Sequence, residues 1–322
     1  MSSASLSELL DWLAVAGPSV GEWRGWRYLP VTGGANNRIV RVTSASQDLA
    51  IKWTIRDARD RAGREYAALT ALRGAGLKLA PAPIWLERER YPEPVVVQSW
   101  LAGEPLTAPP ARDAEWRALL EHLLAIHTVT PSSSPQPLAP AVLSMHSAAD
   151  GLGRFEQQLE SIPPAERPAE LLRLADRLER QSWPTWPEPP LALCRVDPNV
   201  RNFICTPGGL ASVDWENSGW GDPAFELADL LTHPSYAEVP SARQEWLIGE
   251  WCEARAEPWA GPRIRTYRAL MLAWWAARTA RLIYELPRGI DVRLGRFEWG
   301  AGLGEQYQRY RDLASAALAR YH

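Results

Sequence analysis

The stretch CRVDPNVRNF, residues 194–203, places an aspartate and an asparagine five positions apart, at Asp197 and Asn202. A second short apolar run follows the turn PGG at residues 207–209 and ends in VDWE, which contains Asp214. Two apolar runs joined by a proline-glycine turn predict a hairpin. The residues before its first strand and after its second strand share one end of a hairpin. We therefore expect Asp197, Asn202 and Asp214 to lie close together.

Two carboxylates and an amide at one end of a hairpin offer only oxygen ligands. Mg²⁺ prefers such ligands together with phosphate oxygens. If Asn202 and Asp214 hold the metal, Asp197 stays available to accept a proton from a hydroxyl group. Phosphoryl transfer requires a metal that neutralises phosphates and a carboxylate that orients the nucleophile. The spacing of Asp197 and Asn202 alone is weak, because both residue types are common in turns.

The first 100 residues have the pattern of an antiparallel sheet with one helix. Alternating apolar residues bounded by glycine and proline predict strands, and an apolar spacing of three and four predicts the helix. We expect two strands with a glycine turn over residues 26–44, further strands at 49–55, 82–88 and 94–101, and a helix at 59–76. A separate N-terminal helix is predicted from its leucine spacing within residues 1–20.

Lys52 and Glu65 strengthen the phosphotransferase hypothesis. Lys52 is one of only two lysines among 35 basic residues and occupies the centre of a predicted strand, LAIKW. Glu65 lies on the following helix, where its carboxylate can pair with that ammonium. The motif GGANN, with Gly33 and Gly34, precedes this strand and allows the backbone to approach phosphates. Alone, GGANN is more typical of a hairpin turn.

Residues 101–322 have helical spacing throughout, interrupted by the hairpin and by proline-rich loops. Helices are predicted at residues 114–127, 149–162, 168–181, 222–232, 242–254, 265–286 and 305–320. We therefore expect an α+β protein with a β-rich N-terminal lobe at 1–100 and a mainly helical C-terminal lobe at 101–322. The hairpin is embedded in the C-terminal lobe. Asp222 is expected to cap the helix that begins at Pro223.

Composition excludes several classes of protein. The 322 residues are 46% apolar and 23% charged, with a net charge of −3, which gives no electrostatic basis for nucleic-acid binding. Three cysteines form neither a disulfide framework nor a zinc motif. No apolar run is long enough to span a membrane, and the N-terminus lacks the basic region of a signal peptide. These features predict a cytoplasmic location. The sequence gives no indication of oligomeric state.

From about Pro30 to His233 the chain resembles the aminoglycoside phosphotransferase and choline kinase superfamily, small-molecule relatives of the protein kinases. VTGGANNRIVRV is similar to the glycine-rich turn of that family, Lys52 to its ATP-contacting lysine, and Glu65 to its helix glutamate. VVVQSWLAG resembles the hinge, in which the backbone of Ser99 and Leu101 would bind adenine. VDWENSGWGDPAFELADL matches the metal-binding aspartate followed by Gly-Asp-Pro.

The resemblance implies a protein-kinase-like fold that transfers the γ-phosphate of ATP, or alternatively GTP, with Mg²⁺ as cofactor. Asp197 would be the catalytic base, and Asn202 and Asp214 would hold the metal. The family usually has His where this chain has Arg195. That His is mainly a scaffold for the loop, so an arginine with five donors can replace it. The same change is also compatible with a pseudokinase, a nucleotide-binding regulator without activity.

The acceptor is expected to be a small hydroxylated molecule, either an aminoglycoside-like antibiotic or an amino alcohol. Acids and tryptophans near the Gly-Asp-Pro motif suit a cation, although a neutral sugar or a nucleoside is an alternative. Glu216 is expected either to hold the metal ligands in place without touching the metal, or to face the acceptor. Arg201 is a candidate for binding either the γ-phosphate or the acceptor. Trp275 is a candidate for cation binding, although core packing is the more common role of a tryptophan. A protein kinase is disfavoured, because at most eight residues separate DWE from GDP.

Overall fold

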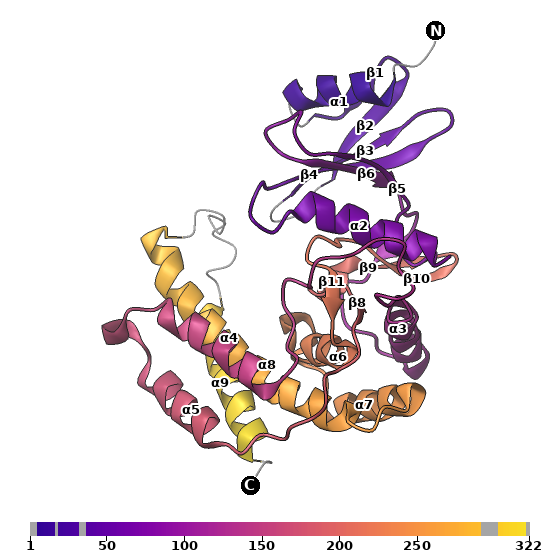
Figure 1. Cartoon of the computed structure of the whole chain (residues 1–322). Helices are drawn as coiled ribbons and strands as arrows, with labels where there is room; N and C mark the ends of the chain where they lie inside the picture. Colours follow the sequence, from indigo (N-terminus) through magenta and orange to yellow (C-terminus); the bar gives the residue numbers. More distant parts are fainter. Residues whose placement is uncertain (1–4, 17–18, 32–36, 291–301, 320–322) are drawn as a thin grey trace. The chain divides into compact units, whose positions relative to one another are not determined.

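The computed structural model describes residues 5–16, 19–31, 37–290 and 302–319 (Figure 1). The chain forms two compact units, residues 1–143 with 191–220 and residues 144–190 with 221–322. Unit 1 contains the elements α1 (Leu6–Val15), β1 (Gly21–Trp23), β2 (Trp26–Val31), β3 (Asn37–Thr43), β4 (Asp48–Thr54), α2 (Arg61–Gly74), β5 (Pro83–Glu87), β6 (Val95–Ser99), β7 (Glu104–Pro105), α3 (Asp113–Ile126), β8 (Ala192–Cys194), β9 (Phe203–Thr206) and β10 (Gly209–Ser212). Strand β11 (Gly219–Gly221) lies at its boundary with unit 2.

Strands β1 to β6 form an antiparallel sheet in the order β1-β2-β3-β4-β6-β5. Successive residues of a strand face opposite sides of a sheet. In β4, Leu49, Ile51 and Trp53 therefore pack on one face, in a core that they share with helix α1. Lys52 faces the opposite side of the same strand. Figure 1 shows α1 and α2 on opposite faces of this sheet, so the lysine faces α2.

The two helices of this sheet are positioned by their apolar residues. Helix α1 begins with a capping box between Ser5 and Glu8 and buries three leucines, Leu9, Leu10 and Leu13. Helix α2 contributes Ala68, Leu69 and Leu72 to a second core, which also contains Trp215 from the segment that follows the hairpin. Helix α2 is therefore packed between the sheet and the hairpin segment, with Glu65 buried.

The predicted hairpin is formed by β9 and β10, which pair antiparallel from Phe203 with Ser212 to Thr206 with Gly209. His122 of α3 holds it from one side, with Nδ1 3.2 Å from the Leu210 carbonyl and Nε2 3.0 Å from the Ser212 hydroxyl. Strand β7 extends this hairpin to three strands, and β8 pairs with β11. Strands β7 and β11 have only two and three residues, and they were not predicted from the sequence.

Unit 2 is helical and consists of α4 (Ala148–Glu160), α5 (Ala169–Arg180), α6 (Pro223–Thr232), α7 (Ser241–Arg255), α8 (Ala260–Glu285) and α9 (Leu303–Leu318). Asp222 is fully buried and caps α6 by accepting a hydrogen bond from the Ala224 N–H, as predicted. Its carboxylate also binds Arg263 at 3.0 Å and accepts a hydrogen bond from the Tyr267 hydroxyl at 2.9 Å, both on α8. These contacts tie α6 to α8.

The sheet and the helical segments confirm the predicted α+β class. The compact units follow packing and place residues 101–143 and 191–220 with the sheet. They do not test the boundary between lobes at residue 100, which stays a prediction. Among the described residues, no helix combines the length and apolar character needed to cross a membrane.

Candidate active site

Lys52 lies at the centre of an acidic cluster in unit 1. Its side chain is 2% exposed, and Nζ donates a hydrogen bond to Glu65 Oε2 at 2.6 Å and another to Asp214 Oδ1. A third carboxylate, Glu216 Oε2, lies 3.5 Å from Nζ. The structure therefore brings together Lys52, Glu65 and Asp214, which were predicted from three distant parts of the sequence.

The charges of this cluster are fixed by their mutual contacts. Burial alone would lower the pKa of Lys52, but the carboxylates of Asp214, Glu65 and Glu216 together raise it above its ordinary value. Burial acts in the opposite direction on Glu65 and raises its pKa to about 7, although Lys52 opposes this shift. Burial would raise the pKa of Asp214, but the ammonium of Lys52 together with the guanidinium groups of Arg195 and Arg61 lowers it below its ordinary value. Asp214 is thus ionised at neutral pH and can bind a cation.

The loop before β9 holds Val196 and Asp197 in an uncommon backbone geometry. Val196 and Asp197 have positive φ angles of 57° and 62°, and Asp214 has a φ of 64°. Residues other than glycine rarely adopt this region, and they cluster at functional sites. The Asn202 carbonyl accepts a hydrogen bond from the Val213 N–H at 2.9 Å, so Asn202 lies beside the segment that carries Asp214. The Asn202 side-chain amide donates to the Asp197 carbonyl at 3.3 Å.

Arg195 connects the two strained segments. Its side chain is 1% exposed. Nη1 donates to the Val213 carbonyl at 3.1 Å, and Nη2 donates to the Asp197 carbonyl at 2.7 Å. The guanidinium carbon also lies 4.8 Å from the centre of the Phe203 ring. These contacts fit the scaffold role expected for this residue.

Asp197 is electrostatically distinct from Asp214. Burial is the largest effect on Asp197, and with the negative charge of Asp214 it raises the pKa of Asp197 to about 6. The guanidinium of Arg195 acts in the opposite direction. Asp214 is thus ionised throughout the neutral range, whereas the pKa of Asp197 lies closer to the range in which a general base is effective.

Glu216 is buried and engaged on both oxygens. It is 4% exposed. Oε1 accepts a hydrogen bond from Nη1 of Arg61 at the start of α2, and Oε2 accepts one from Nδ2 of Asn37 at 2.8 Å. Sequence reasoning missed both donors. One signal for Arg61 exists, because it precedes Glu65 by four residues and therefore shares its helix face.

Some backbone groups of the predicted hinge residues already form hydrogen bonds within the protein. The Ser99 N–H donates to the Ala82 carbonyl at 2.9 Å, and the Ser99 hydroxyl accepts from the Ala82 N–H. Within the described part of the chain, the Leu101 N–H has no hydrogen-bond partner. The Leu101 N–H is therefore open to a ligand, as the predicted hinge role requires. Gly33 and Gly34 lie outside the described residues.

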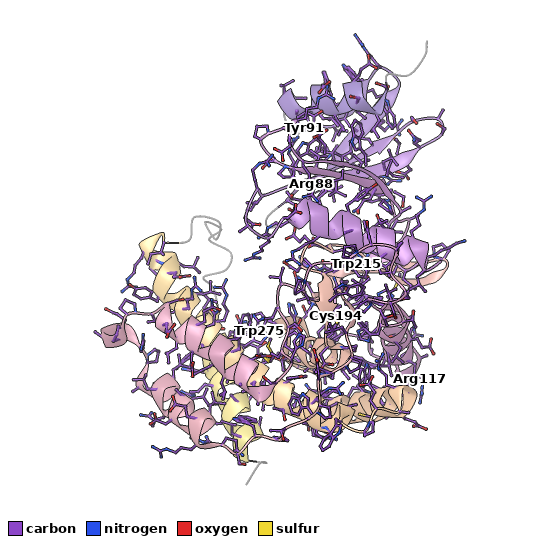
Figure 2. The ribbon with its side chains drawn as sticks, in the orientation of Figure 1. Arg88, Tyr91, Arg117, Cys194, Trp215 and Trp275 are labelled. Atoms are coloured by element: carbon purple, nitrogen blue, oxygen red, sulfur yellow. The ribbon has the colours of Figure 1, made fainter. Side chains whose placement is uncertain are left out.

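Arg201 and Trp275 occupy different surroundings. Arg201 is exposed, on the 3₁₀ turn Val200–Asn202 that precedes β9. Trp275 lies on α8 of unit 2 (Figure 2) and stacks on Tyr310 of α9 at 5.6 Å between ring centres, with His233 edge-on at 5.8 Å. Unit 2 also has a cavity of about 440 Å³, lined by Pro234, Ala237, Glu238, Gly302, Glu305, Gln306, Arg309 and Tyr310.

The donor set fits Mg²⁺. Carboxylate oxygens of Glu65, Asp214 and Glu216 lie within 4.8 Å of one another. Of these three, Glu65 is bound by Lys52 and Glu216 by Arg61 and Asn37, and each is almost fully buried. The Asp214 side chain is 31% exposed. Asp214 is therefore the carboxylate in this cluster that an incoming ion can reach. The Asn202 amide donates through nitrogen to Asp197, which leaves its oxygen for a metal.

Comparison with known proteins places the chain among phosphotransferases. A family model described as "Phosphotransferase enzyme family" matches residues 27–267, more than half of the chain. A Ralstonia eutropha protein assigned to the aminoglycoside phosphotransferases is 16% identical, with a TM-score of 0.69 and 98% of each chain covered.

Two further solved structures share the fold. A spectinomycin phosphotransferase in complex with ADP and spectinomycin is 15% identical, with a TM-score of 0.63 and coverage of 98% of this chain and 99% of that one. A choline/ethanolamine kinase family protein of Mesorhizobium loti is 21% identical, with a TM-score of 0.56 and coverage of 97% and 98%. The matched structures have protein-kinase-like folds, as expected from the sequence.

Proposed function

Because the chain belongs to the phosphotransferase enzyme family and is a small-molecule kinase, we propose that it transfers the γ-phosphate of ATP to a hydroxyl of a small cationic molecule. GTP is the alternative donor. One observation carries this assignment: Nζ of Lys52 contacts Glu65 and Asp214 at once, so one buried ammonium joins the sheet, helix α2 and the hairpin segment. A nucleotide site requires these three parts in one place.

Lys52 and the hinge would hold the nucleotide. Glu65 fixes the direction of the Lys52 side chain, because its carboxylate is buried and accepts a hydrogen bond from Nζ. The ammonium would contact the α- and β-phosphates, while the Ser99 carbonyl and the Leu101 N–H would bind the adenine edge. Gly33 and Gly34 would bring the backbone of the turn against the phosphates. The exposed guanidinium of Arg201 is available for the γ-phosphate.

Asn202 and Asp214 would hold Mg²⁺ through their side-chain oxygens. When bound, the ion neutralises the charge that develops on the phosphates. The hydrogen bond from Val213 to Asn202 keeps the two ligands in fixed relation. The positive φ of Asp214 turns its side chain towards Lys52. Preorganised ligands of this kind lose little free energy to rearrangement during the reaction.

Asp197 would accept the proton of the acceptor hydroxyl. Its pKa of about 6 leaves it mostly ionised at neutral pH and still basic enough to hydrogen-bond the hydroxyl. Arg195 fixes the Asp197 backbone by donating a hydrogen bond from Nη2 to the Asp197 carbonyl at 2.7 Å. The oxygen of the acceptor then becomes the nucleophile that displaces ADP from the γ-phosphate.

The cationic class of the acceptor has two supports. The similar structures include a spectinomycin phosphotransferase and a choline/ethanolamine kinase family protein, whose named substrates carry both an amine and a hydroxyl. The cavity in unit 2 is lined by Glu305 and Tyr310, and a carboxylate with an aromatic ring suits an amine; Glu238 of the same lining is paired with Arg309. Glu226 and Asp229 are 2% and 3% exposed and contribute less, because they are buried within α6.

A panel assay tests the proposed function. The protein is incubated with Mg²⁺ and ATP or GTP, and with aminoglycosides, macrolides, choline, homoserine and methylthioribose. A product that is heavier than the acceptor by one phosphoryl group supports the assignment, provided that Asp197→Asn does not form it. Stabilisation by Mg-ATP without phosphorylation of any compound favours the pseudokinase. Phosphorylation of methylthioribose, the neutral sugar of the panel, and of no other compound would contradict the proposal of a cationic acceptor.

A further inference from the structure

Glu216 accepts hydrogen bonds on both of its carboxylate oxygens. Arg61 donates to Oε1, Asn37 donates to Oε2 at 2.8 Å, and Lys52 Nζ lies 3.5 Å from Oε2. Its side chain is 4% exposed. A buried carboxylate requires such compensation, because an unpaired charge in the protein interior is costly. Each oxygen of Glu216 therefore already has a donor from another element of unit 1.

The three partners of Glu216, namely Arg61, Asn37 and Lys52, come from α2, β3 and β4 of unit 1. Arg61 begins α2, the helix that carries Glu65. Asn37 begins β3, the strand that follows the glycine turn. Glu216 itself lies two residues after Asp214. Glu216 therefore connects the segment that carries Asp214 with helix α2 and strand β3.

Arg61 is itself fixed in place. It is 4% exposed, and its Nε donates to Asp57 Oδ2 at 3.0 Å while Nη1 donates to Glu216. A second arginine of the same helix, Arg64, donates to the Pro140 carbonyl at 2.6 Å and the Ser218 carbonyl at 3.2 Å. Helix α2 is thus attached at two points to the segment that carries Asp214 and Glu216.

We propose that Glu216 is a positioning residue that joins strand β3 and helix α2 to the segment that carries Asp214, so that the nucleotide site is assembled before ATP arrives. This assignment rests on the proposed function. Glu216 acts on the nucleotide through Asn37 and Arg61, and it does not touch the nucleotide or the metal. Loss of the carboxylate leaves Lys52 paired with Glu65 but releases β3 and α2 from the hairpin segment.

Calorimetric titration with Mg-ADP, in the absence of any acceptor, measures this role directly. The variants are Glu216→Gln, Asn37→Ala and the double variant, with Glu121→Gln, an exposed residue of α3, as the matched control. Glu216→Gln keeps an oxygen acceptor but turns an NH₂ group towards one of the two donors. We expect about tenfold weaker Mg-ADP binding, a coupling typical of residues in one hydrogen-bond network.

Asn37→Ala is expected to weaken Mg-ADP binding about threefold or more, and the double variant to bind no more weakly than Glu216→Gln. The Mg²⁺ concentration at half-saturation should stay at the wild-type value. Equal Mg-ADP affinity of wild type and both single variants would overturn positioning by Glu216, as would an additive double variant. An increased Mg²⁺ requirement in Glu216→Gln but not in Asn37→Ala would make Glu216 a metal ligand instead.

Folding and function are separated by two further readouts. If Glu216→Gln does not fold, the half-buried neutral Asn37→Ala decides the outcome by the same titration. If wild type itself binds no Mg-ADP, the proposed function fails together with this inference. If wild type binds and the variants match it, only the role of Glu216 is contradicted.

Discussion

Replacing Arg195 tests whether the catalytic loop is held by a substitute for the usual histidine. The guanidinium makes two hydrogen bonds from a charged donor, to the carbonyls of Val213 and Asp197, at 1% exposure. Each such bond contributes about 1.5 kcal/mol or more. Arg195→Ala removes both and leaves two carbonyls without this donor. We expect a loss of about 3–5 kcal/mol in the free energy of unfolding.

The same substitution should reduce turnover. Val196, Asp197 and Asp214 have positive φ angles, a conformation that costs about 1–3 kcal/mol per residue and depends on the surrounding contacts. Without Arg195, the carboxylates of Asp197 and Asp214 lose their fixed relation. A displacement of about 1 Å at reacting groups can reduce kcat about 100-fold. Arg195→His keeps one donor, and we expect values of stability and kcat between those of wild type and Arg195→Ala.

Urea denaturation followed by tryptophan fluorescence gives the stability, and steady-state kinetics with the best acceptor of the panel give kcat. Arg27→Ala is the matched control, because Arg27 is 72% exposed in its side chain and its ion pair with Glu22 spans 3.5 Å. The control should lie within about 0.5 kcal/mol of wild type. Wild-type stability and wild-type kcat in Arg195→Ala would refute the scaffold role. Activity that appears only in Arg195→His would identify Arg195 as a mark of lost catalysis.

Three further changes have defined outcomes. Asp197→Ala should reduce kcat at least 1000-fold while the affinity for Mg-ADP, measured by calorimetry, stays within about threefold of wild type, because the base is not a nucleotide contact; a variant that retains wild-type kcat would reassign the base. The pKa of Asp197 is raised to about 6 and the ionised form is the active one, so kcat/KM should fall as pH decreases through about 6. Because Arg195 lowers this pKa, the acid limb of the pH profile should move to higher pH in Arg195→Gln. An acid limb that does not move would contradict the assignment of Asp197 as the base. Asp222→Ala leaves Arg263 without its buried partner and removes the α6 cap, so the free energy of unfolding should decrease by about 3–5 kcal/mol; an unchanged denaturation midpoint would contradict the structural role.

Patterns that depend on local spacing were predictable. The strand that carries Lys52, the helix that carries Glu65 and the hairpin each have their own periodicity and turn residues. Asp222 as the cap of α6 follows from Pro223 at the next position. The roles proposed for Asp197, Asn202 and Asp214 were inferred from their placement at one end of that hairpin, and they stay predictions.

Contacts between distant segments were not predictable from spacing. Glu216 is separated by 179 positions from Asn37 and by 155 from Arg61, and no periodicity connects them. The sequence left open whether Glu216 served the metal or the acceptor, and only the positions of these two donors suggest a third role. Strands β7 and β11 form because their neighbours β9 and β8 present unpaired edges, and two or three residues cannot show an alternating pattern.

A crystal structure with a non-hydrolysable ATP analogue and Mg²⁺ tests the central claim most directly. We predict an ion about 2.1 Å from side-chain oxygens of Asn202 and Asp214, with Nζ of Lys52 on the α- and β-phosphates. The side chain of Asp197 should face the γ-phosphate from the acceptor side. An ion bound away from Asn202 and Asp214, or a triphosphate that Lys52 does not contact, would contradict the claim.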